Sequence, residues 1–323
     1  MDKLQGKRVL VTGASGKVGI PMSERLLRDD NEVWGIARFT KPERKKRLDD
    51  MGVHTRVVDL LDPDFSELPE DFDHVIHLGG DVCQGDETGI FMPNGASFLL
   101  ANQVNGIGTG KLMSRFRNAE SCLVVSTTGV FKKRDPDQYD VAEVEDGLLG
   151  AFHDDAPQYS ASKNAQEVVA RFSAEEFGLP TTIARLGCQV STIEDGLVAG
   201  YVGAIAAGMP FPGFHADRPC VYQYIHDDDI YDHVPGLLSI ASTKPDTLNW
   251  TGAEVVDIRD VATYIGKRIG QENIEFVEDP WGLMCTISDT SKLLERVGPC
   301  KLDWKESMDR VVDDLMPECP RLS

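Results

Sequence analysis

The chain has 323 residues, of which 53 are acidic and 33 basic, so its formal net charge at pH 7 is −20. This excess of negative charge repels nucleic acids and anionic membrane surfaces, which excludes both as expected partners, and any anionic ligand needs a local positive site. Seven cysteines without a C-x-x-C pair indicate reduced thiols and a cytoplasmic protein. No apolar run approaches the ~18 residues of a membrane-spanning helix.

The first part of the chain alternates short runs rich in β-branched residues with stretches of helical spacing. This alternation predicts an α/β fold, a Rossmann doubly wound parallel sheet with helices on both faces. Beyond Leu186 the alternation blurs and Gly and Pro cluster at 208–213, which indicates a second, smaller region. The expected strands are 7–12, 32–37, 54–60, 74–78, 121–126 and 181–186, and the expected helices follow Gly16 or cover 41–48, 96–117 and 159–176.

A glycine-rich turn stands between the first strand and the first helix. It reads Val11-Thr12-Gly13-Ala14-Ser15-Gly16-Lys17-Val18-Gly19, with the spacing G-x-x-G-x-x-G. The first glycine allows a tight turn, the second lets the backbone approach a pyrophosphate, and the third lets helix and strand pack closely. Because free N–H groups at a helix N-terminus bind phosphate, the turn predicts a dinucleotide site.

The residues after the second strand favour NADP(H) over NAD(H). An NAD site places a carboxylate at the end of this strand, but here Ala37 takes that place and Arg38 follows. Arginine offers a planar fork for a 2′-phosphate, and Lys17 could add a second cation. A solvent-facing arginine in a basic loop is the alternative. Asp59, after the third strand, is placed to bind the adenine amino group, or else to cap a helix.

A tyrosine and a lysine in the middle of the chain have the spacing of a proton-transfer pair. Tyr159 and Lys163 are four residues apart, so they share one face of a helix. A lysine ammonium beside a phenol lowers the tyrosine pKa from ~10 and prepares it for general acid–base catalysis. Lys163 can also hydrogen-bond the nicotinamide ribose. Thr127, at the carboxyl end of the fifth strand, supplies a hydroxyl for the substrate oxygen.

Together these motifs resemble those of the extended short-chain dehydrogenase/reductase family, also called NAD-dependent epimerase/dehydratases. The resemblance covers nearly the whole chain. Its further motifs are, in chain order, Val75-Ile76-His77-Leu78-Gly79-Gly80, Asn105-Gly106-Ile107-Gly108-Thr109, Ser126-Thr127-Thr128-Gly129-Val130-Phe131, Tyr224-Ile225-His226-Asp227-Asp228-Asp229-Ile230, Leu248-Asn249-Trp250-Thr251-Gly252 and Asp289-Thr290-Ser291-Lys292-Leu293.

The resemblance implies a Rossmann NADP-binding domain over 1–186 plus about 225–250, and a smaller substrate-binding domain over 187–224 and 251–323. It implies that Thr127, Tyr159 and Lys163 are catalytic, and that a homodimer forms through the helices bearing N-x-x-G-T and Y-x-x-x-K. The implied cofactor-binding residues are Gly13, Ser15, Gly16, Lys17, Val18, Gly19, Arg38, Asp59, Leu60, Leu78, Gly79, Gly80, Asn105, Val125, Tyr159, Lys163 and Leu186.

Departures from the family's pattern bear on the substrate. Sugar-nucleotide dehydratases carry Asp-Glu after the catalytic threonine, where this chain has Thr128-Gly129. Sugar-nucleotide enzymes also place an arginine just before Y-I-H to bind the diphosphate, where this chain has Tyr222-Gln223. These losses indicate a small carbonyl or hydroxyl compound without a diphosphate tail. The expected substrate-binding residues are Asp81, Val82, Thr127, Thr128, Tyr159, Cys188, Gln189 and Tyr222.

The first hypothesis is therefore an NADP(H)-dependent oxidoreductase that interconverts a carbonyl and an alcohol on a small substrate, by hydride transfer with Tyr159 as general acid/base. The alternative is a nucleotide-sugar epimerase or reductase that uses bound NAD(P). A non-catalytic nucleotide sensor is a third interpretation, which the intact Thr127, Tyr159 and Lys163 disfavour. His77 is interpreted as a core histidine, and no metal is expected at His226.

Overall fold

A computed structural model describes the chain apart from residues 1–2, 81–94, 133–141, 143, 148, 151–156, 194–195, 216–218, 279–286 and 323. The chain divides into two compact units. Unit 1 contains Met1–Lys132, Leu148–Arg185 and Tyr231–Leu248, and unit 2 contains Lys133–Gly147, Leu186–Ile230 and Asn249–Ser323.

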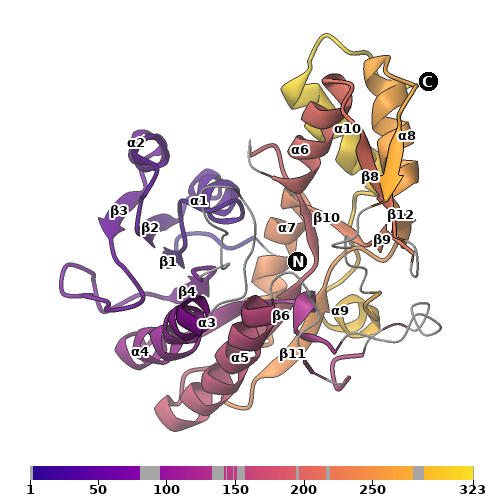
Figure 1. The fold of residues 1–323 in the computed structure, drawn as a ribbon. Helices are drawn as coiled ribbons and strands as arrows, with labels where there is room; N and C mark the ends of the chain where they lie inside the picture. The colour runs from indigo at the N-terminus through magenta and orange to yellow at the C-terminus, as the bar shows by residue number, and fades with distance from the viewer. Residues whose placement is uncertain are drawn as a thin grey trace. The chain divides into compact units, whose positions relative to one another are not determined.

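The central feature of unit 1 is a seven-stranded sheet in the order β11-β6-β5-β4-β1-β2-β3 (Figure 1). The pairs β1–β2, β2–β3, β1–β4 and β4–β5 are parallel, which confirms the predicted doubly wound sheet. The chain moves outward from β1 to β3 and then returns to β4 beside β1, so the strand order reverses between β1 and β4. The strands are β1 (Arg8–Thr12), β2 (Glu32–Ala37), β3 (His54–Val57), β4 (His74–His77), β5 (Ser121–Thr127), β6 (Thr181–Leu186) and β11 (Asp246–Trp250).

One helix and one strand of unit 1 differ clearly from the sequence prediction. The predicted helix 96–117 is three consecutive segments, because a π-helical turn at Gln103–Ile107 separates α3 from α4. The predicted strand 54–60 ends at Val57, because the carboxylate of Asp59 accepts a hydrogen bond from the Leu61 amide at 3.0 Å and forms a turn. The helices are α1 (Gly19–Arg28), α2 (Pro42–Met51), α3 (Gly95–Asn102), α4 (Gly108–Arg115), α5 (Pro157–Phe177) and α7 (Asp227–Ser239).

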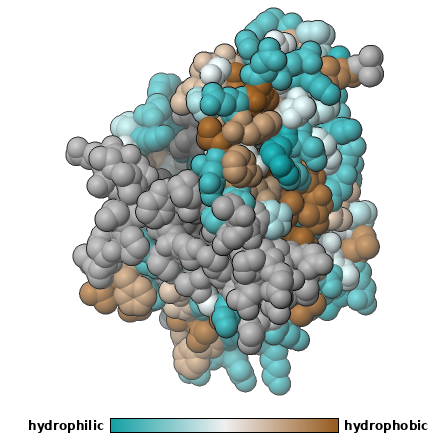
Figure 2. Space-filling view, turned by 45° about the vertical axis from the view of Figure 1, so that its right-hand side comes forward, coloured by the Kyte–Doolittle hydropathy of each residue, from teal (hydrophilic) through white to brown (hydrophobic). Residues whose placement is uncertain are grey.

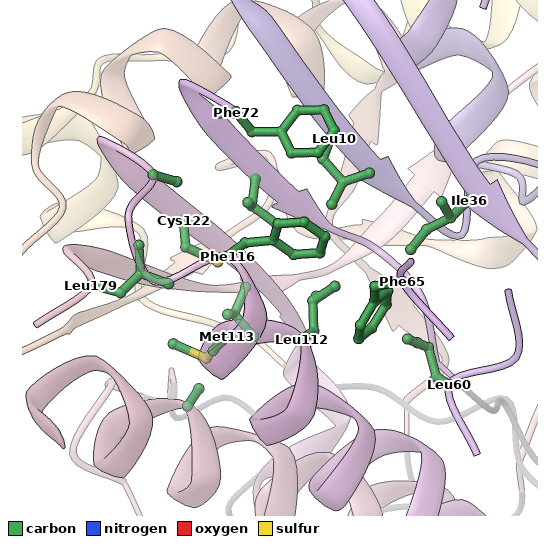
Figure 3. Packing of buried hydrophobic residues seen from close by; sticks show 14 of the residues in the cluster. Leu10, Ile36, Leu60, Phe65, Phe72, Leu112, Met113, Phe116, Cys122 and Leu179 are labelled. Atoms are coloured by element: carbon green, nitrogen blue, oxygen red, sulfur yellow. The ribbon is translucent and has the colours of Figure 1, made fainter. Parts of the chain in front are cut away.

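Aromatic side chains fill the core between the sheet and α4. The ring of Phe116 meets the rings of Phe65 and Phe72 edge-on, with centroids 5.4 Å apart in each pair (Figure 3). Leu10 from β1 and Leu112 from α4 are completely buried in the same cluster. Burying a side chain of this kind stabilises the fold by about 1.5–3 kcal/mol, so this layer fixes α4 and the segment before it against the sheet.

Two glycines of the turn after β1 permit contacts that no other residue allows. Gly13 has φ +64°, and a Cβ there would lie 2.8 Å from the Gly79 nitrogen at the end of β4. Gly19 begins α1, and a Cβ there would lie 2.3 Å from the carbonyl oxygen of Gly13. The turn is therefore compressed between β4 and the first turn of α1.

Unit 2 has its own core, formed by α6, α8 and α10 and three short strand pairs. Phe211, Ile258 and Val312 are among its fully buried members. Strand β7 (Cys188–Val190) pairs with β10 (Tyr224–His226), β9 (Val221–Tyr222) with β12 (Val256–Asp257), and β8 (Phe211–Phe214) with β13 (Phe276–Glu278). The helices are α6 (Leu197–Ala206), α8 (Ile258–Ile269), α9 (Ser291–Arg296) and α10 (Trp304–Leu315).

Hydrophilic side chains are spread across the described part of the face drawn in Figure 2, with smaller groups of hydrophobic ones between them. Within the described ranges, no helix combines the length and the apolar character that crossing a membrane requires.

Alanine substitutions at two helical glycines should have opposite effects on stability. Gly19→Ala places a methyl group into the Gly13 carbonyl, so the turn must move and the free energy of unfolding should fall by about 2 kcal/mol or more. Gly200→Ala, on an exposed face of α6 with open space around its Cβ position, should raise it by about 0.5–1 kcal/mol. Urea unfolding of both variants checks this, and equal effects would contradict the packing described for Gly19.

Candidate active site

The glycine turn lies at the carboxyl ends of β1 and β4, where the strand order reverses. Ligands of doubly wound sheets bind at such a point. No side chain caps the first turn of α1. A Cβ at Gly16 would lie 3.0 Å from the Gly13 carbonyl oxygen, so a larger residue would fill the space beside this uncapped helix end. The glycine turn and the first turn of α1 therefore fit the pyrophosphate of a dinucleotide.

Positive charge gathers around this turn although the chain is strongly acidic. Lys17 and Arg38 are exposed, and Arg38 directly follows β2 as the sequence predicts. The next residue, Phe39, is buried with φ +50°, which turns the backbone sharply at this point. Arg44 on α2 is also buried, and its Nη1 donates to the Ser15 carbonyl oxygen at 3.1 Å.

Sequence reasoning missed Arg44. It stands in the run Pro42-Glu43-Arg44-Lys45-Lys46-Arg47, where several cations look alike. Only its burial and its bond to the glycine turn distinguish it from its neighbours. A weak signal was available, because Arg44 and Leu48 are four residues apart and form the buried face of α2.

The end of β5 is held against α5 at points on both sides of Thr127. The Lys163 Nζ donates to the Val125 carbonyl oxygen at 2.8 Å, and Ser126 Oγ donates to Glu167 Oε1 at 2.7 Å. After Thr127, the side chain of Asn164 donates to the Val130 carbonyl oxygen at 3.2 Å. The structure thus places Lys163 against the strand that ends at Thr127, with Tyr159 one turn before Lys163 on the same face of α5.

The charged side chains of Lys163, Glu167 and Arg185, next to the end of β5, are buried. Burial lowers the pKa of Lys163 to about 8, while the neighbouring carboxylate of Glu167 opposes the shift. Burial alone would raise the pKa of Glu167, but hydrogen bonds and charge from Arg185, with Ser126, bring it below its usual value. Arg185 donates from Nε at 2.8 Å and from Nη2 at 2.9 Å. Arg171 adds a third, half-exposed donor at 3.1 Å.

The π-helical turn places Asn105 beside the same residues. Its Nδ2 donates to Ser162 Oγ at 2.8 Å, and that hydroxyl donates to the Tyr159 carbonyl oxygen at 2.8 Å. A Cβ at Gly80 would lie 2.9 Å from Asn105 Oδ1 and 3.9 Å from Lys163 Nζ. Gly80, Asn105 and Lys163 are therefore neighbours, as the resemblance implies for a cofactor site.

The other predicted residues of unit 1 lie near these groups or at the ends of the same strands. Leu60 is buried, and its side chain comes within 2.9 Å of a Cβ built at Gly79. Asp59 is exposed, Leu78 directly follows β4, and Thr128 begins a 3₁₀ turn after β5.

Four predicted residues belong to unit 2, and two lie outside the described residues. Leu186 ends β6, Cys188 and Gln189 lie on β7, and Tyr222 on β9 stacks at a tilt against Tyr224 with centroids 5.8 Å apart. Burial raises the pKa of the Cys188 thiol to about 12. Asp81 and Val82 are the two outside the description.

Gln223 occupies the position at which sugar-nucleotide enzymes have arginine. Its side chain is buried and bonded to the backbone, with Nε2 donating to the carbonyl oxygens of Gly252 and Ser288 at 3.1 Å each. Its Oε1 accepts from the Ser288 amide at 2.6 Å. These bonds occupy the amide, so Gln223 serves the fold of unit 2.

Neutralising Glu167 should destabilise unit 1 strongly. Glu167→Gln leaves Arg185 buried without its carboxylate, which should lower the free energy of unfolding by about 3–5 kcal/mol at pH 7. Because the folded-state pKa of Glu167 is lowered, its contribution is present above the unfolded pKa of ~4.3 and is lost as pH falls through the folded value. The variant should therefore lose part of the acid-side slope of stability.

Unfolding measured by denaturant between pH 3 and pH 7 checks both statements. Arg171→Gln is the matched control, because Arg171 binds the same carboxylate from a side chain that is 38% exposed. The Arg171→Gln substitution should lower the free energy of unfolding by less than about 1 kcal/mol. Equal losses in the two variants would contradict the buried-pair interpretation.

Comparison with solved structures shows the same fold in three 4-epimerases. UDP-N-acetylglucosamine 4-epimerase from Methanobrevibacter ruminantium has a TM-score of 0.78 at 19% identity over 98% of this chain and 100% of that one. UDP-glucuronic acid 4-epimerase from Bacillus cereus, solved with UDP-glucuronic acid and NAD, has a TM-score of 0.76 at 20% identity; the match covers 95% of this chain and 99% of that one. UDP-glucose 4-epimerase from Thermus thermophilus, solved with NAD, has a TM-score of 0.76 at 23% identity; the match covers 95% of this chain and 98% of that one.

A sequence model described as the NAD dependent epimerase/dehydratase family matches residues 9–238. The matched range covers well over half of the chain and contains the glycine turn, Thr127, Tyr159 and Lys163. The chain belongs to the NAD dependent epimerase/dehydratase family.

Proposed function

We propose that the protein interconverts an alcohol and a carbonyl on a sugar substrate carried by a nucleotide, in the manner of an epimerase. The observation that carries the chemistry is that Lys163, one turn after Tyr159 on α5, bonds the Val125 carbonyl oxygen two residues before Thr127. The nucleotide-sugar substrate is supported by the solved 4-epimerases, which share the fold over nearly their whole length.

In this proposal Thr127, Tyr159 and Lys163 bind the substrate oxygen or help to move its hydroxyl proton. Thr127 donates a hydrogen bond to the substrate oxygen, and Tyr159 takes the hydroxyl proton during oxidation and returns it during reduction. The ammonium of Lys163 stabilises the phenolate, and the buried Glu167 favours the charged form of Lys163. When bound, a nicotinamide dinucleotide supplies the two-electron acceptor and donor.

The cofactor we propose is NADP(H) in preference to NAD(H). Arg38 and Lys17 are exposed at the glycine turn, and the end of β2 has no carboxylate to bind a ribose 2′-hydroxyl. Arg44 contacts the glycine turn by donating a hydrogen bond to the Ser15 carbonyl oxygen. The solved 4-epimerases named above include two with NAD, so the preference for the 2′-phosphate rests on these cations alone.

A small carbonyl compound without a diphosphate is the second candidate substrate. It is favoured by Gln223, whose buried amide stands in place of the arginine that binds a diphosphate. In that case the protein is an NADP(H)-dependent reductase, and each turnover consumes one cofactor molecule.

We also propose that the protein is a homodimer formed through α5 and the helical segment from α3 to α4, which carries the N-x-x-G-T motif at 105–109. Four large apolar side chains on these segments are more than half exposed, and a surface that groups such side chains is typical of protein–protein contacts. A molar mass in solution of twice 35.6 kDa is the expected result. The four residues are Leu99, Ile107, Val168 and Phe172.

An epimerase and a reductase give different products from the same experiment. Incubation with UDP-glucose, UDP-glucuronic acid or UDP-N-acetylglucosamine should yield the C4 epimer with no net change in nicotinamide absorbance. Tyr159→Phe should keep dinucleotide binding and lower turnover by a factor of about 10²–10⁴, because the phenol is the proton carrier. Retained turnover in Tyr159→Phe would refute this mechanism, and stoichiometric oxidation of NADPH by small aldehydes or ketones would establish the second candidate.

The cofactor preference can be tested separately by titration. Arg38→Ala should raise the dissociation constant for NADPH on the order of tenfold and leave that for NADH nearly unchanged, because only NADPH carries the 2′-phosphate. Arg47→Ala is the matched control, since Arg47 is a half-exposed cation on α2 that faces Glu24 at 3.8 Å. Tighter binding of NADH than of NADPH by the unaltered protein would contradict the role given to Arg38.

A further inference from the structure

His77 is a completely buried histidine that the proposed chemistry does not use. It lies on β4, and both of its ring nitrogens face threonine hydroxyls. Nδ1 is 2.7 Å from Thr12 Oγ1, and Nε2 is 2.8 Å from Thr109 Oγ1. These two threonines belong to different elements, β1 and α4, so the imidazole bridges them.

The partners of the two hydroxyls favour one arrangement of the protons in this group. Thr109 Oγ1 donates to the Asn105 carbonyl oxygen at 2.6 Å, which favours a protonated Nε2 that donates to this hydroxyl. The side-chain nitrogen of Gln166 lies 3.2 Å from the same hydroxyl and 3.3 Å from Nε2. Thr12 Oγ1 accepts from the Gly79 amide at 2.8 Å and keeps its own proton for Nδ1. A neutral imidazole with its proton on Nε2 therefore satisfies all of these groups.

The environment keeps this imidazole neutral. Burial lowers the pKa of His77 to about 3, and the positive charge of Lys163 acts in the same direction. A group with this pKa does not titrate between pH 5 and pH 9, so the directions of the hydrogen bonds are constant over that range.

The two ends of the hydrogen-bond chain reach the two halves of the candidate site. Thr12 precedes Gly13, whose Cβ position lies 2.8 Å from the same Gly79 amide nitrogen. At the other end, Asn105 lies in the π-helical turn, and its side chain donates to Ser162, which in turn donates to the Tyr159 carbonyl oxygen. The order is Gly79, Thr12, His77, Thr109 and Asn105.

We propose that His77 is a positioning residue that couples the phosphate-binding turn to the helix carrying Tyr159 and Lys163. The coupling rests on the proposed function, because it assumes that the turn binds a dinucleotide. The imidazole touches neither cofactor nor substrate in this proposal. It holds Thr12 and Thr109 at a fixed separation through a neutral ring that carries its proton on Nε2.

The first test reads the tautomer directly. In ¹⁵N-labelled protein, the His77 ring should show a protonated Nε2 and an unprotonated Nδ1, with no change in either shift between pH 5 and pH 9. Assignment uses loss of the signal in His77→Asn. A proton on Nδ1, or a titration within this range, would overturn the hydrogen-bond chain, whatever the protein binds.

The second test compares two histidines of the same strand. His77→Asn should raise the dissociation constant for NADPH on the order of tenfold and lower kcat as well, because both ends of the chain lose their partner. His74→Asn is the matched control, since His74 is buried at the amino end of β4 and bonds Ser121 Oγ at 2.9 Å. It should reduce thermal stability and leave binding and kcat unchanged. Equal binding by wild type and His77→Asn would show that His77 is only a core residue.

Thr109→Val tests the same hydrogen-bond chain if the His77→Asn variant does not fold. It keeps the side-chain volume at position 109 and removes the hydroxyl that His77 contacts. It should also weaken NADPH binding, and its effect should shrink in a His77→Asn, Thr109→Val double variant. Full additivity would overturn the coupling. If the unaltered protein bound no dinucleotide, the proposed function would fail and the coupling with it, while the tautomer would still be decided by the first test.

Discussion

The attachment of α5 to the last residues of β5 is the constraint on which the candidate site depends. Lys163 and Glu167 are one helical turn apart, and they bond Val125 and Ser126, which are consecutive residues of the strand. Desolvating a lysine and a glutamate costs several kcal/mol each, and the cost is offset only where their partners are fixed. Arg185, held against the Phe131 ring at 4.9 Å, supplies that fixed partner for Glu167. The end of β5 that carries Thr127 is therefore held at a defined place against α5.

Charge is distributed unevenly in a way that suits an anionic ligand. The chain as a whole carries a formal charge of −20, and many acidic residues are paired at the surface. Around the glycine turn the sign is reversed by Lys17, Arg38 and Arg44. An exposed cation in a field of negative charge attracts a phosphate group selectively, so the acidic surface and the basic turn act together.

The sequence was sufficient for features that depend on local chemistry. The run before Gly13, the glycine spacing and the Tyr159–Lys163 pair predict the sheet, the turn and the helix face, because each signal lies within a few residues. The π-helical turn at 103–107 could not be predicted, since the spacing of apolar residues does not mark where an extra residue is inserted and its contacts are with α5, far along the chain. The contacts of Arg44 with Ser15 and of His77 with Thr12 and Thr109 join residues 29 to 65 positions apart, and nothing local in the sequence marks them.

The division of unit 1 into three stretches of chain has a consequence for how the protein is made. Strand β6 ends at residue 186, but its neighbour β11 begins only at residue 246, after the Leu186–Ile230 stretch of unit 2 has been synthesised. Until then β6, whose first five residues are buried in the finished sheet, presents an edge of unpaired backbone N–H and C=O groups to solvent. A nascent chain stalled between these two strands is therefore exposed to edge-to-edge aggregation, and a chaperone would act on that interval of synthesis.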